Sequence, residues 1–353
     1  MPHTLHNVKY IFSVFAFSSR RVSIKMGCSS WKYQLLCLLL SLLFYSPSFF
    51  TSSLSSISQC SALLQFNNSL SLDSSASPSF HASRIQMCDN SYPKTASWKE
   101  DKDCCTWDGV VCDKTTGHVT GLDLSCSWLN GPIHSNNTLF FLPHLKTLNL
   151  AGNNFKHSLI SSEFGNFKAL THLNLSYSGF SSKIPYEISH LSSLLSVDLS
   201  YNSWLLIETP VWKRIIHNLT QFRELILDST NMSSIRPNSL MNLSSSLTTL
   251  SLHECDLHGK LENNILCLPS IQILDLRENK NLDLGSLPKC NWNRSSLKFL
   301  DFSWISFSGE LPNSIGNLKS LKVLALDNCN FTGSIPTSNW KPHPNYLFIS
   351  IKK

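Results

Sequence analysis

Four aspartates recur at one position of a repeated Leu-x-Leu pattern: Asp123, Asp198, Asp275 and Asp301. If the fold stacks these positions, the carboxylates would form an acidic row, and a carboxylate pair can perform general acid and base catalysis. The simpler interpretation is that they hydrogen-bond to neighbouring strands on an exposed face. We favour it because the sequence contains no nucleophile motif and no phosphate-binding loop. We therefore expect no catalytic residue, no cofactor and no enzyme activity.

Charged and aromatic side chains occupy other variable positions of the same pattern. If these positions face outward from an open sheet, they would form a surface that binds a ligand. Trp304 is the most indicative, because an exposed aromatic ring on an open sheet often anchors a partner. The alternative, that each side chain is merely solvated, stays open for any single residue. The candidate ligand-binding residues are Arg223, Glu224, Asp228, His253, Glu254, Arg277, Glu278, Phe299 and Trp304.

The pattern that would position these residues runs from Val119 onward. An aliphatic residue is followed by two variable residues, an aliphatic, one variable and an aliphatic, and then by two variable residues and Asn, Cys or a small residue. A period of about 25 residues lies in the range of leucine-rich repeats. The third aliphatic of the nine copies stands at residues 124, 150, 175, 199, 227, 252, 276, 302 and 326.

Each Leu-x-Leu core predicts a short strand whose leucines point inward and whose variable residues point outward. Strands of successive repeats would stack in parallel about 4.8 Å apart on the concave side. The Asn or Cys after each strand would turn inward and satisfy backbone groups of the turn. The predicted fold is an α/β solenoid, a leucine-rich-repeat superhelix with about nine repeats over residues 118–336.

Twelve cysteines and eight Asn-x-Ser/Thr sequons indicate an oxidising compartment of the secretory pathway. A zinc site is the rival use of the cysteines. The sequence has no Cys-x-x-Cys pair and no histidine at ligand spacing beside the cysteines, so we expect no metal site. Cys255 and Cys329 stand at the inward Asn position, which predicts buried thiols, and Cys267 and Cys290 form a candidate pair. The candidate glycosylation sites are Asn67, Asn136, Asn174, Asn218, Asn231, Asn242, Asn293 and Asn330.

An apolar run at residues 35–45 has the length of a secretory signal. Lys32 precedes it and a hydroxyl-rich tract follows it, which is the usual layout of such a signal. A membrane anchor is the alternative, but Pro47 ends the run before the roughly 20 apolar residues that a spanning helix needs. We therefore predict a signal peptide that is cleaved near Ser58.

The signal would begin at Met26, because residues 26–33 form a short basic stretch before the apolar run. We therefore predict a signal peptide over residues 26–58 and interpret residues 1–25 as an upstream or non-native extension. Residues 1–58 contain five Lys and Arg and no Asp or Glu, so five of the six net positive charges lie there. The repeats themselves lack a basic excess, and we expect no nucleic-acid partner.

Residues 59–117 are expected to cap the first repeat, since a solenoid must shield its terminal core from water. An amphipathic helix begins at Cys60, and the run Asp-Cys-Cys-Thr-Trp-Asp-Gly-Val-Val-Cys occupies residues 103–112. Cys104 and Cys105 are adjacent and do not readily pair with each other, so each needs a partner elsewhere. Six cysteines in this region allow fifteen connectivities, and their spacing does not choose among them.

The motifs of this cap carry a family resemblance. The run Cys-Ser-Ala-Leu-Leu-Gln-Phe from Cys60, the cysteine-rich run at residues 103–112 and Thr-Gly-His-Val at residues 116–119 resemble the start of the ectodomain of plant receptor-like proteins of the leaf-mould-resistance type. The resemblance covers about residues 26–336. It implies a cell-surface immune receptor without a kinase, at the plasma membrane or in the apoplast.

The resemblance also implies partners and disulfides. Such proteins sense microbial or cell-wall-derived ligands, so an extracellular protein, peptide or glycan ligand is expected, together with a receptor kinase as co-receptor. Cys88 and Cys126 remain as a third pair that the resemblance leaves open. The pairs taken from similar caps are Cys60 with Cys104 and Cys105 with Cys112.

The repeat pattern fails after Pro336. Residues 337–353 resemble neither a repeat nor a second cap, and no C-terminal spanning segment follows. We expect an exposed core edge at this end and a tendency to aggregate. Two alternatives to a receptor ectodomain stay open, namely a secreted inhibitor resembling polygalacturonase-inhibiting proteins and a non-functional, truncated receptor fragment.

Overall fold

The structure is a computed structural model that divides into two units, residues 1–51 and 52–353. It describes residues 59–77, 80–82, 85–202, 204–261, 263–285, 292, 295–307, 309–332 and 348–350, all of them in the second unit. The predicted signal peptide, the extension before it, Cys290 and Asn293 lie outside the described residues.

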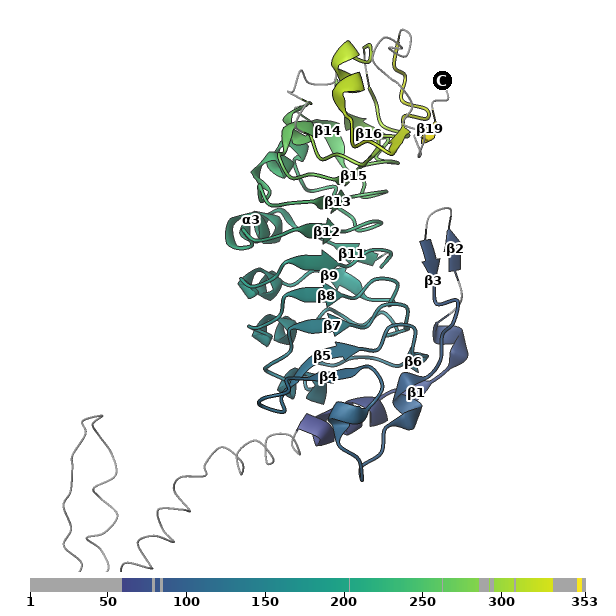
Figure 1. Ribbon diagram of the computed structural model, residues 1–353, viewed down its shortest axis with the longest axis vertical. Coiled ribbons are helices and arrows are strands. Elements are labelled where there is room, and N and C mark those ends of the chain that lie inside the picture. The colour runs from purple at the N-terminus through teal and green to yellow at the C-terminus, as the bar shows by residue number, and fades with distance from the viewer. Residues whose placement is uncertain are drawn as a thin grey trace, which may run out of the picture. The chain divides into compact units, whose positions relative to one another are not determined.

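Strands from successive repeats form one long sheet (Figure 1). Nine of these strands coincide with the nine predicted Leu-x-Leu copies, and they run parallel in chain order. The predicted solenoid is thereby confirmed. The strands of this concave sheet are β4 (Val110–Cys112), β5 (Val119–Asp123), β7 (Thr147–Asn149), β8 (His172–Asn174), β10 (Ser196–Asp198), β12 (Glu224–Ile226), β13 (Thr249–Ser251), β15 (Ile273–Asp275), β17 (Phe299–Asp301), β18 (Val323–Ala325) and β19 (Phe348–Ser350).

The two outermost strands do not come from the repeat pattern. Strand β4 belongs to the cap and pairs antiparallel with β5. Strand β19 pairs parallel with β18, and the Leu326 amide donates to the Ser350 carbonyl at 2.9 Å. Residues 337–353 do not follow the repeat pattern, yet Phe348–Ser350 adds a strand to the sheet. Backbone pairing needs no leucine pattern, so the sequence carried no signal for this strand.

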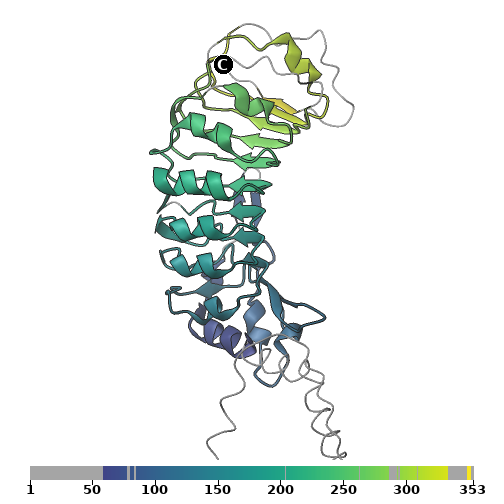
Figure 2. The same ribbon diagram turned by 90° about the vertical axis from the view of Figure 1, so that its left-hand side faces the viewer.

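Helical turns cover the side opposite the concave sheet (Figure 2). Two small parallel sheets pair β9 with β11 and β14 with β16. In the chain, each of these four strands follows the strand of its repeat that belongs to the concave sheet. Their strands are β9 (Ser181–Lys183), β11 (Trp204–Leu206), β14 (His258–Lys260) and β16 (Asn281–Asp283). The helices are η4 (Thr138–Phe141), η5 (Ser162–Asn166), η6 (Tyr186–His190), α3 (Thr209–Asn218), η7 (Pro237–Asn242), η8 (Asn263–Cys267) and η10 (Asn313–Asn317), all 3₁₀ except α3.

The core is a stack of equivalent apolar side chains. Leu148, Leu173, Val197 and Leu225 are register partners in neighbouring strands, and each is at most 2% exposed. Burial of such side chains from every repeat stabilises the array, since a single repeat cannot bury its own apolar face.

A buried asparagine holds the turn after several strands. The Asn202 amide donates to the Leu175 and Leu199 carbonyls at 2.8 and 2.9 Å, and its oxygen accepts from the backbone amides of Ser178 and Phe180 at 3.2 and 2.9 Å. The predicted inward turn is thereby confirmed. Asn153 and Asn279 make the same set of bonds.

Cysteines at the position of this asparagine make only some of its hydrogen bonds. The thiols of Cys255 and Cys329 are buried and donate to the carbonyls of Leu227 and Phe302 at 3.1 and 2.8 Å. Burial raises the pKa of the Cys329 thiol to about 11. Both thiols are therefore neutral hydrogen-bond donors to buried backbone carbonyls, and their inward position had predicted that they are buried.

Each strand ends in a tight turn with one residue in the left-handed region. The residue two positions after the third aliphatic has a φ between 50° and 66° in every copy. This repeated geometry directs the residues at the end of the strand along one edge of the concave sheet. The nine residues are Cys126, Gly152, Tyr177, Tyr201, Ser229, Glu254, Glu278, Trp304 and Asn328.

The cap combines a helix over residues 59–68 with short strands and 3₁₀ turns. Trp98 and Trp107 stack with ring centroids 5.0 Å apart and bury most of their surface beside the helix residues Leu63 and Phe66. The remaining elements are β1 (Ser71–Leu72), which pairs with β6 (Leu129–Asn130), β2 (Phe80–Ala82), which pairs with β3 (Ile85–Met87), and the turns η1 (Ser74–Ala76), η2 (Lys94–Ser97) and η3 (Cys104–Thr106).

Three disulfides are present among the described residues, and two of them are the pairs that the family resemblance implied. Cys267 is also disulfide-bonded, although its expected partner, Cys290, lies outside the described residues. Closure of loops of 38 and 44 residues restricts the unfolded chain and stabilises the cap. The three pairs are Cys60–Cys104, Cys88–Cys126 and Cys105–Cys112.

Candidate functional site

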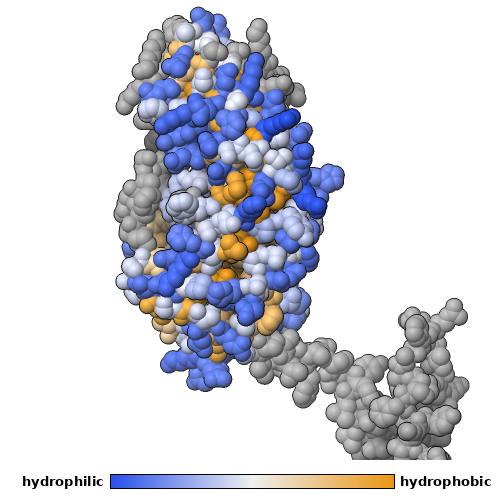
Figure 3. All heavy atoms as spheres, turned by 180° about the vertical axis from the view of Figure 1, so that it is seen from behind, coloured by the Kyte–Doolittle hydropathy of each residue, from blue (hydrophilic) through white to orange (hydrophobic). Residues whose placement is uncertain are grey.

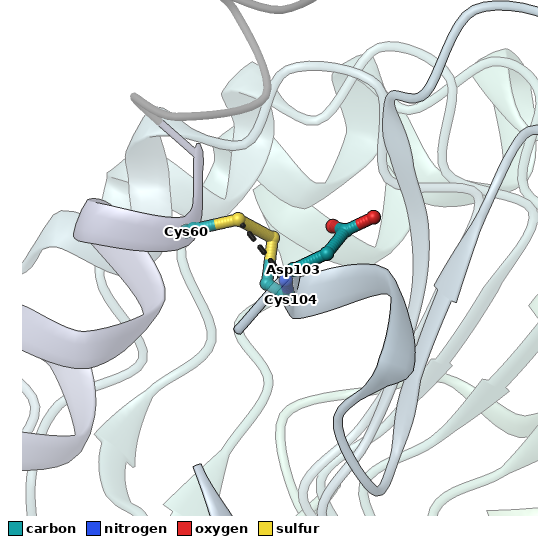
Figure 4. A group of neighbouring side chains, drawn as sticks. All are labelled: Cys60, Asp103 and Cys104. Carbon is teal, nitrogen blue, oxygen red and sulfur yellow. Dashed lines mark hydrogen bonds between the residues drawn. A yellow bond between two sulfur atoms is a disulfide. The ribbon is translucent and has the colours of Figure 1, made fainter. Parts of the chain in front are cut away.

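One group of potential metal ligands occurs among the described residues, at Cys60, Asp103 and Cys104 (Figure 4). The two sulfur atoms form a disulfide, so neither is a thiolate that could bind a metal. The Cys104 amide donates to the Cys60 sulfur at 3.3 Å, and Asp103 accepts from the Cys105 amide at 3.0 Å. The group is a structural part of the cap.

The concave sheet contains a pocket of about 460 Å³. Residues on or next to strands β8, β10, β12, β13, β15 and β17 line it. Met87, at the end of β3 in the cap, lines it as well. The pocket is bounded by four kinds of side chain, namely aspartates with one arginine, a pair of tyrosines, apolar residues, and neutral serine, threonine and asparagine residues. The ionisable lining residues are Tyr177, Asp198, Tyr201, Asp228, Asp275 and Arg277.

Two tyrosines form one wall of the pocket. The rings of Tyr177 and Tyr201 stack with centroids 4.3 Å apart and planes inclined by 20°. Both residues occupy the left-handed position after their strands, which is why they fall side by side. The Tyr201 hydroxyl lies 3.3 Å from Nδ1 of His253. Burial, together with nearby Asp228, raises the pKa of Tyr201 to about 12, so the wall is uncharged.

The four aspartates share one register position of the sheet, but other residues occupy that position on the strands between some of them. Asp275 and Asp301 are direct register partners, whereas Asp198 lies opposite Asn174 and Ile226, and Asp123 opposite Asn149. The carboxylates of Asp123, Asp198 and Asp301 accept from the residue two positions further along their own chain.

Asp123 is exposed, as the interpretation of the aspartates as exposed groups expects, whereas Asp275 and Asp301 are only 6% and 1% exposed. Each of these two buried carboxylates accepts a backbone hydrogen bond from the residue two positions further along the chain. The strand pattern alone does not reveal this, because a carboxylate at a strand end is close to the amides of its own turn.

Burial makes the pocket carboxylates hard to ionise. It raises the pKa of Asp198 to about 6, although two hydrogen bonds from Ser200 oppose the shift. Burial raises the pKa of Asp275 to about 7, with repulsion from Asp301 adding to it and Arg277 opposing it. Burial raises the pKa of Asp228 as well. Three neighbouring carboxyl groups therefore lack enough positive charge to offset their desolvation.

Arg277 is the cation of this pocket. Its Nε lies 3.6 Å from Asp275 and one terminal nitrogen lies 3.7 Å from Asp301. Burial disfavours its charge, but these two carboxylates outweigh that effect and raise the pKa of Arg277. Both distances exceed a hydrogen bond, so the guanidinium neutralises the pair without binding either carboxylate tightly.

The structure brings four of the candidate binding residues together and leaves the others apart. Asp228, Arg277 and Phe299 line the pocket, and His253 contacts its Tyr201 wall. The His253 amide donates to Asp228 at 3.0 Å, and its Nε2 lies 3.3 Å from Glu278. These four candidates come from four successive repeats.

The remaining candidates lie on the surface around it. Glu224 accepts from the Ser196 hydroxyl at 2.8 Å and lines a second pocket of about 400 Å³. Glu254 accepts from Ser229 at 3.2 Å. Trp304 is 46% exposed at the left-handed turn position, with the Lys280 ammonium 5.5 Å from its ring centre. Arg223 and Glu278 are exposed.

Sequence reasoning did not name the two tyrosines among the binding residues. Tyr177 and Tyr201 stand at the same turn position as Glu254, Glu278 and Trp304, which it did name. Extending that position through all copies would have found both. Their stacking could not be found in this way, because it depends on the distance between successive turns.

The sequons differ in exposure. Asn136, Asn218, Asn231, Asn242 and Asn330 are exposed and Asn67 is half-buried. Asn174 is also half-buried and lies on β8, where it lines the pocket, so a glycan on it would cover part of the concave sheet.

The surface seen from behind is mostly hydrophilic, with apolar residues gathered along its middle (Figure 3). Among the described residues, no helix has both the length and the apolar character needed to cross a membrane. A family model described as Leucine Rich Repeat matches residues 144–167, 169–191, 296–318 and 320–341.

Two curated relatives show high similarity over the cap and repeats. Receptor-like protein 6 of Arabidopsis thaliana is 43% identical over 231 residues, which is 64% of this chain and 23% of that protein. Receptor-like protein Cf-9 of Solanum pimpinellifolium is 41% identical over 238 residues, which is 67% of this chain and 27% of that protein. The chain belongs to the plant leucine-rich-repeat receptor-like proteins. It spans about a quarter of the length of these relatives.

Solved structures support the same fold for this receptor-like chain. The ectodomain of the Arabidopsis thaliana receptor kinase GASSHO1/SCHENGEN3, in complex with CASPARIAN STRIP INTEGRITY FACTOR 2, has a TM-score of 0.56 at 24% identity and covers 78% of this chain and 33% of its own. The PEPR1–AtPEP1 structure has a TM-score of 0.53 at 25% identity, with 79% and 39% covered. A plant ice-binding protein has a TM-score of 0.58 at 23% identity, with 79% and 88% covered, so the fold alone does not assign a ligand.

Proposed function

We propose that this receptor-like chain is an extracellular recognition module that binds a microbial or cell-wall-derived ligand, a peptide above all, on its concave sheet. It would act through a partner receptor kinase, at the cell surface or in the apoplast. The observation that carries the proposal is the pocket on this sheet, where charged and aromatic residues of successive repeats converge. Convergent polar groups in a partly apolar pocket are typical of a ligand site.

Similarity to the relatives supports the same assignment. Receptor-like protein 6 and Cf-9 are receptors by name, and the fold is shared with PEPR1 in its AtPEP1 structure.

A glycan placed on the concave sheet tests the proposal. Thr249 lies on β13 in the pocket, and Thr249→Asn creates an Asn-Leu-Ser sequon with Leu250 and Ser251. The whole chain, secreted from plant cells, would be used to select binders from a phage library of random dodecapeptides. We expect Thr249→Asn to weaken binding of the selected peptides by at least about tenfold, since a glycan excludes a ligand from the sheet.

Two further variants make the result specific. His190→Asn introduces the same Asn-Leu-Ser sequon on η6, on the helical side, and should leave binding within about twofold of the unmodified chain. Asn174→Gln removes the natural sequon beside the pocket and should leave binding equal or stronger. Equal loss with both introduced sequons, or undiminished binding by Thr249→Asn, contradicts recognition by the concave sheet.

A further inference from the structure

The pocket on β8 to β17 has more negative than positive side chains. Asp198, Asp228 and Asp275 line it with Arg277, and Asp301 lies beside Arg277 at 3.7 Å. One arginine therefore faces four carboxyl groups. Its guanidinium stands 3.6 Å or more from the two nearest, so it does not satisfy even that pair by direct hydrogen bonds.

The walls suit an organic cation better than a hydrated metal ion. The stacked faces of Tyr177 and Tyr201 offer the π surface over which guanidinium and ammonium groups bind. Four apolar side chains share the lining with five neutral polar residues, and they suit the aliphatic stem of a long cationic residue. These apolar residues are Met87, Ile226, Ile273 and Phe299.

An anionic group fits poorly at the same place. It would reach Arg277 only among the carboxylates of Asp275 and Asp301, which already share that cation. Like charges at this separation repel each other strongly where water is excluded. Charge complementarity therefore selects a positive ligand group.

We propose that this pocket is a subsite for one arginine or lysine side chain of an extracellular peptide. The cation lies against the Tyr177–Tyr201 wall, where the pocket carboxylates Asp198, Asp228 and Asp275 attract it, and its stem contacts the apolar residues of the pocket. The inference rests on the proposed function, because it places the side chain of a ligand that the concave sheet recognises. It adds the chemical class of the residue that is recognised.

Small probes test the subsite without knowledge of the natural ligand. Binding of N-acetyl-arginine amide to the whole chain would be measured by saturation-transfer NMR and titration at pH 7.5. The neutral isostere N-acetyl-citrulline amide, N-acetyl-aspartate amide and the free polyamine putrescine are the comparison probes. We expect the arginine probe to bind at least about tenfold more tightly than the citrulline probe, and the aspartate probe not to bind.

Variants assign the binding to this pocket. The double variant Asp198→Asn with Asp275→Asn should weaken the arginine probe by about tenfold or more, since two of the three carboxylates that line the pocket are lost. Asp123→Asn is the matched control, because it changes the same ladder position at the other end of the sheet and should have no effect. Arg277→Gln should strengthen the arginine probe, because it removes the competing cation.

The outcomes separate this inference from the proposed function. Equal binding of the arginine and citrulline probes, or loss of binding in Arg277→Gln, overturns the cationic subsite. Putrescine binding as tightly as the arginine probe overturns the peptide side chain in favour of a free polyamine. If library peptides bind the concave sheet but ignore Asp198→Asn with Asp275→Asn, the subsite is refuted and the proposed function stands. If arginine binds here but the Thr249→Asn glycan spares the library peptides, the proposed function fails instead.

Discussion

The two ends of the concave sheet share one backbone and differ in chemistry. At the outward strand position, β7 and β8 carry Asn149 and Asn174, whereas β15 and β17 carry Asp275 and Asp301. One residue after the third aliphatic, Ala151 and Ser176 of the early repeats contrast with Arg277. The strand register and the turn geometry are the same at both ends. Repeats therefore supply identical positions, and side-chain identity alone decides which of them become a site.

The largest effect on the free energy of unfolding is expected at the buried turn asparagine, which both ends of the sheet share. Asn153→Leu and Asn279→Leu each remove a buried amide and leave two backbone amides and two carbonyls without their partner. We expect each to cost about 3 kcal/mol or more, because an unsatisfied buried polar group costs about 1–3 kcal/mol. Chemical denaturation monitored by tryptophan fluorescence measures the loss.

Equal losses at Asn153 and Asn279 would show that the scaffold is the same in both halves of the sheet. A small loss at one site only would mean that the local backbone there rearranges, and the two ends would no longer be comparable. The control is Asn149→Ser, which changes an outward position of β7 two residues before Ala151. It should cost less than about 0.5 kcal/mol.

The next effect should differ in sign between the ends. Burial holds the pKa of Asp275 at about 7, above its ordinary value of 3.8, with Asp301 and Asp228 adding to the shift and Arg277 opposing it. A carboxyl whose pKa is raised by folding stabilises the protein below pH 4, and that stability is lost as the pH rises through 7. Asp275→Asn should therefore be neutral at pH 4 and gain about 2 kcal/mol at pH 8.

Asp123 should behave in the opposite way. Burial opposes its ionisation, but hydrogen bonds from Ser125 and the Lys94 ammonium outweigh it and lower its pKa. Its contribution is present above pH 4 and is lost as the pH falls. Because its side chain is 56% exposed, Asp123→Asn should cost only a few tenths of a kcal/mol at pH 7 and nothing at pH 2. Unfolding midpoints between pH 4 and 8 for Asp275→Asn, extended to pH 2 for Asp123→Asn, test both signs, and the same sign at both sites would contradict the contrast.

The smallest effect is expected at Trp304. Its ring is 46% exposed and contacts Lys280 over 5.5 Å, so Trp304→Ala should change the free energy of unfolding by less than about 0.5 kcal/mol. Phe302→Ala, two residues earlier and 1% exposed, should cost about 3 kcal/mol or more. Denaturation of the two variants side by side measures the difference. A large loss at Trp304 would mean that this turn is part of the core.

The sequence alone predicted the scaffold closely, because its signals are local. The Leu-x-Leu period predicted all nine repeat strands, and the asparagine after the strand predicted the buried ladder at Asn153 and Asn202. Each strand and each turn is encoded by residues within one repeat, and the recurrence over nine copies makes the pattern detectable. The pairing of Phe348–Ser350 with β18 had no such signal, since it uses backbone groups only.

The candidate site was predicted only in part. Position in the repeat was enough to single out Asp228, His253 and Arg277, and to place the aspartates in one register. The stacking of Tyr177 on Tyr201 and the burial of Asp275 and Asp301 were decided by the tertiary structure. The physical reason is that a side chain's charge state depends on water, and access of water is set by neighbours from other repeats. The sequence by itself determined which residues share the concave face, whereas only the packing of successive repeats decided that three carboxyl groups and one arginine line a single pocket.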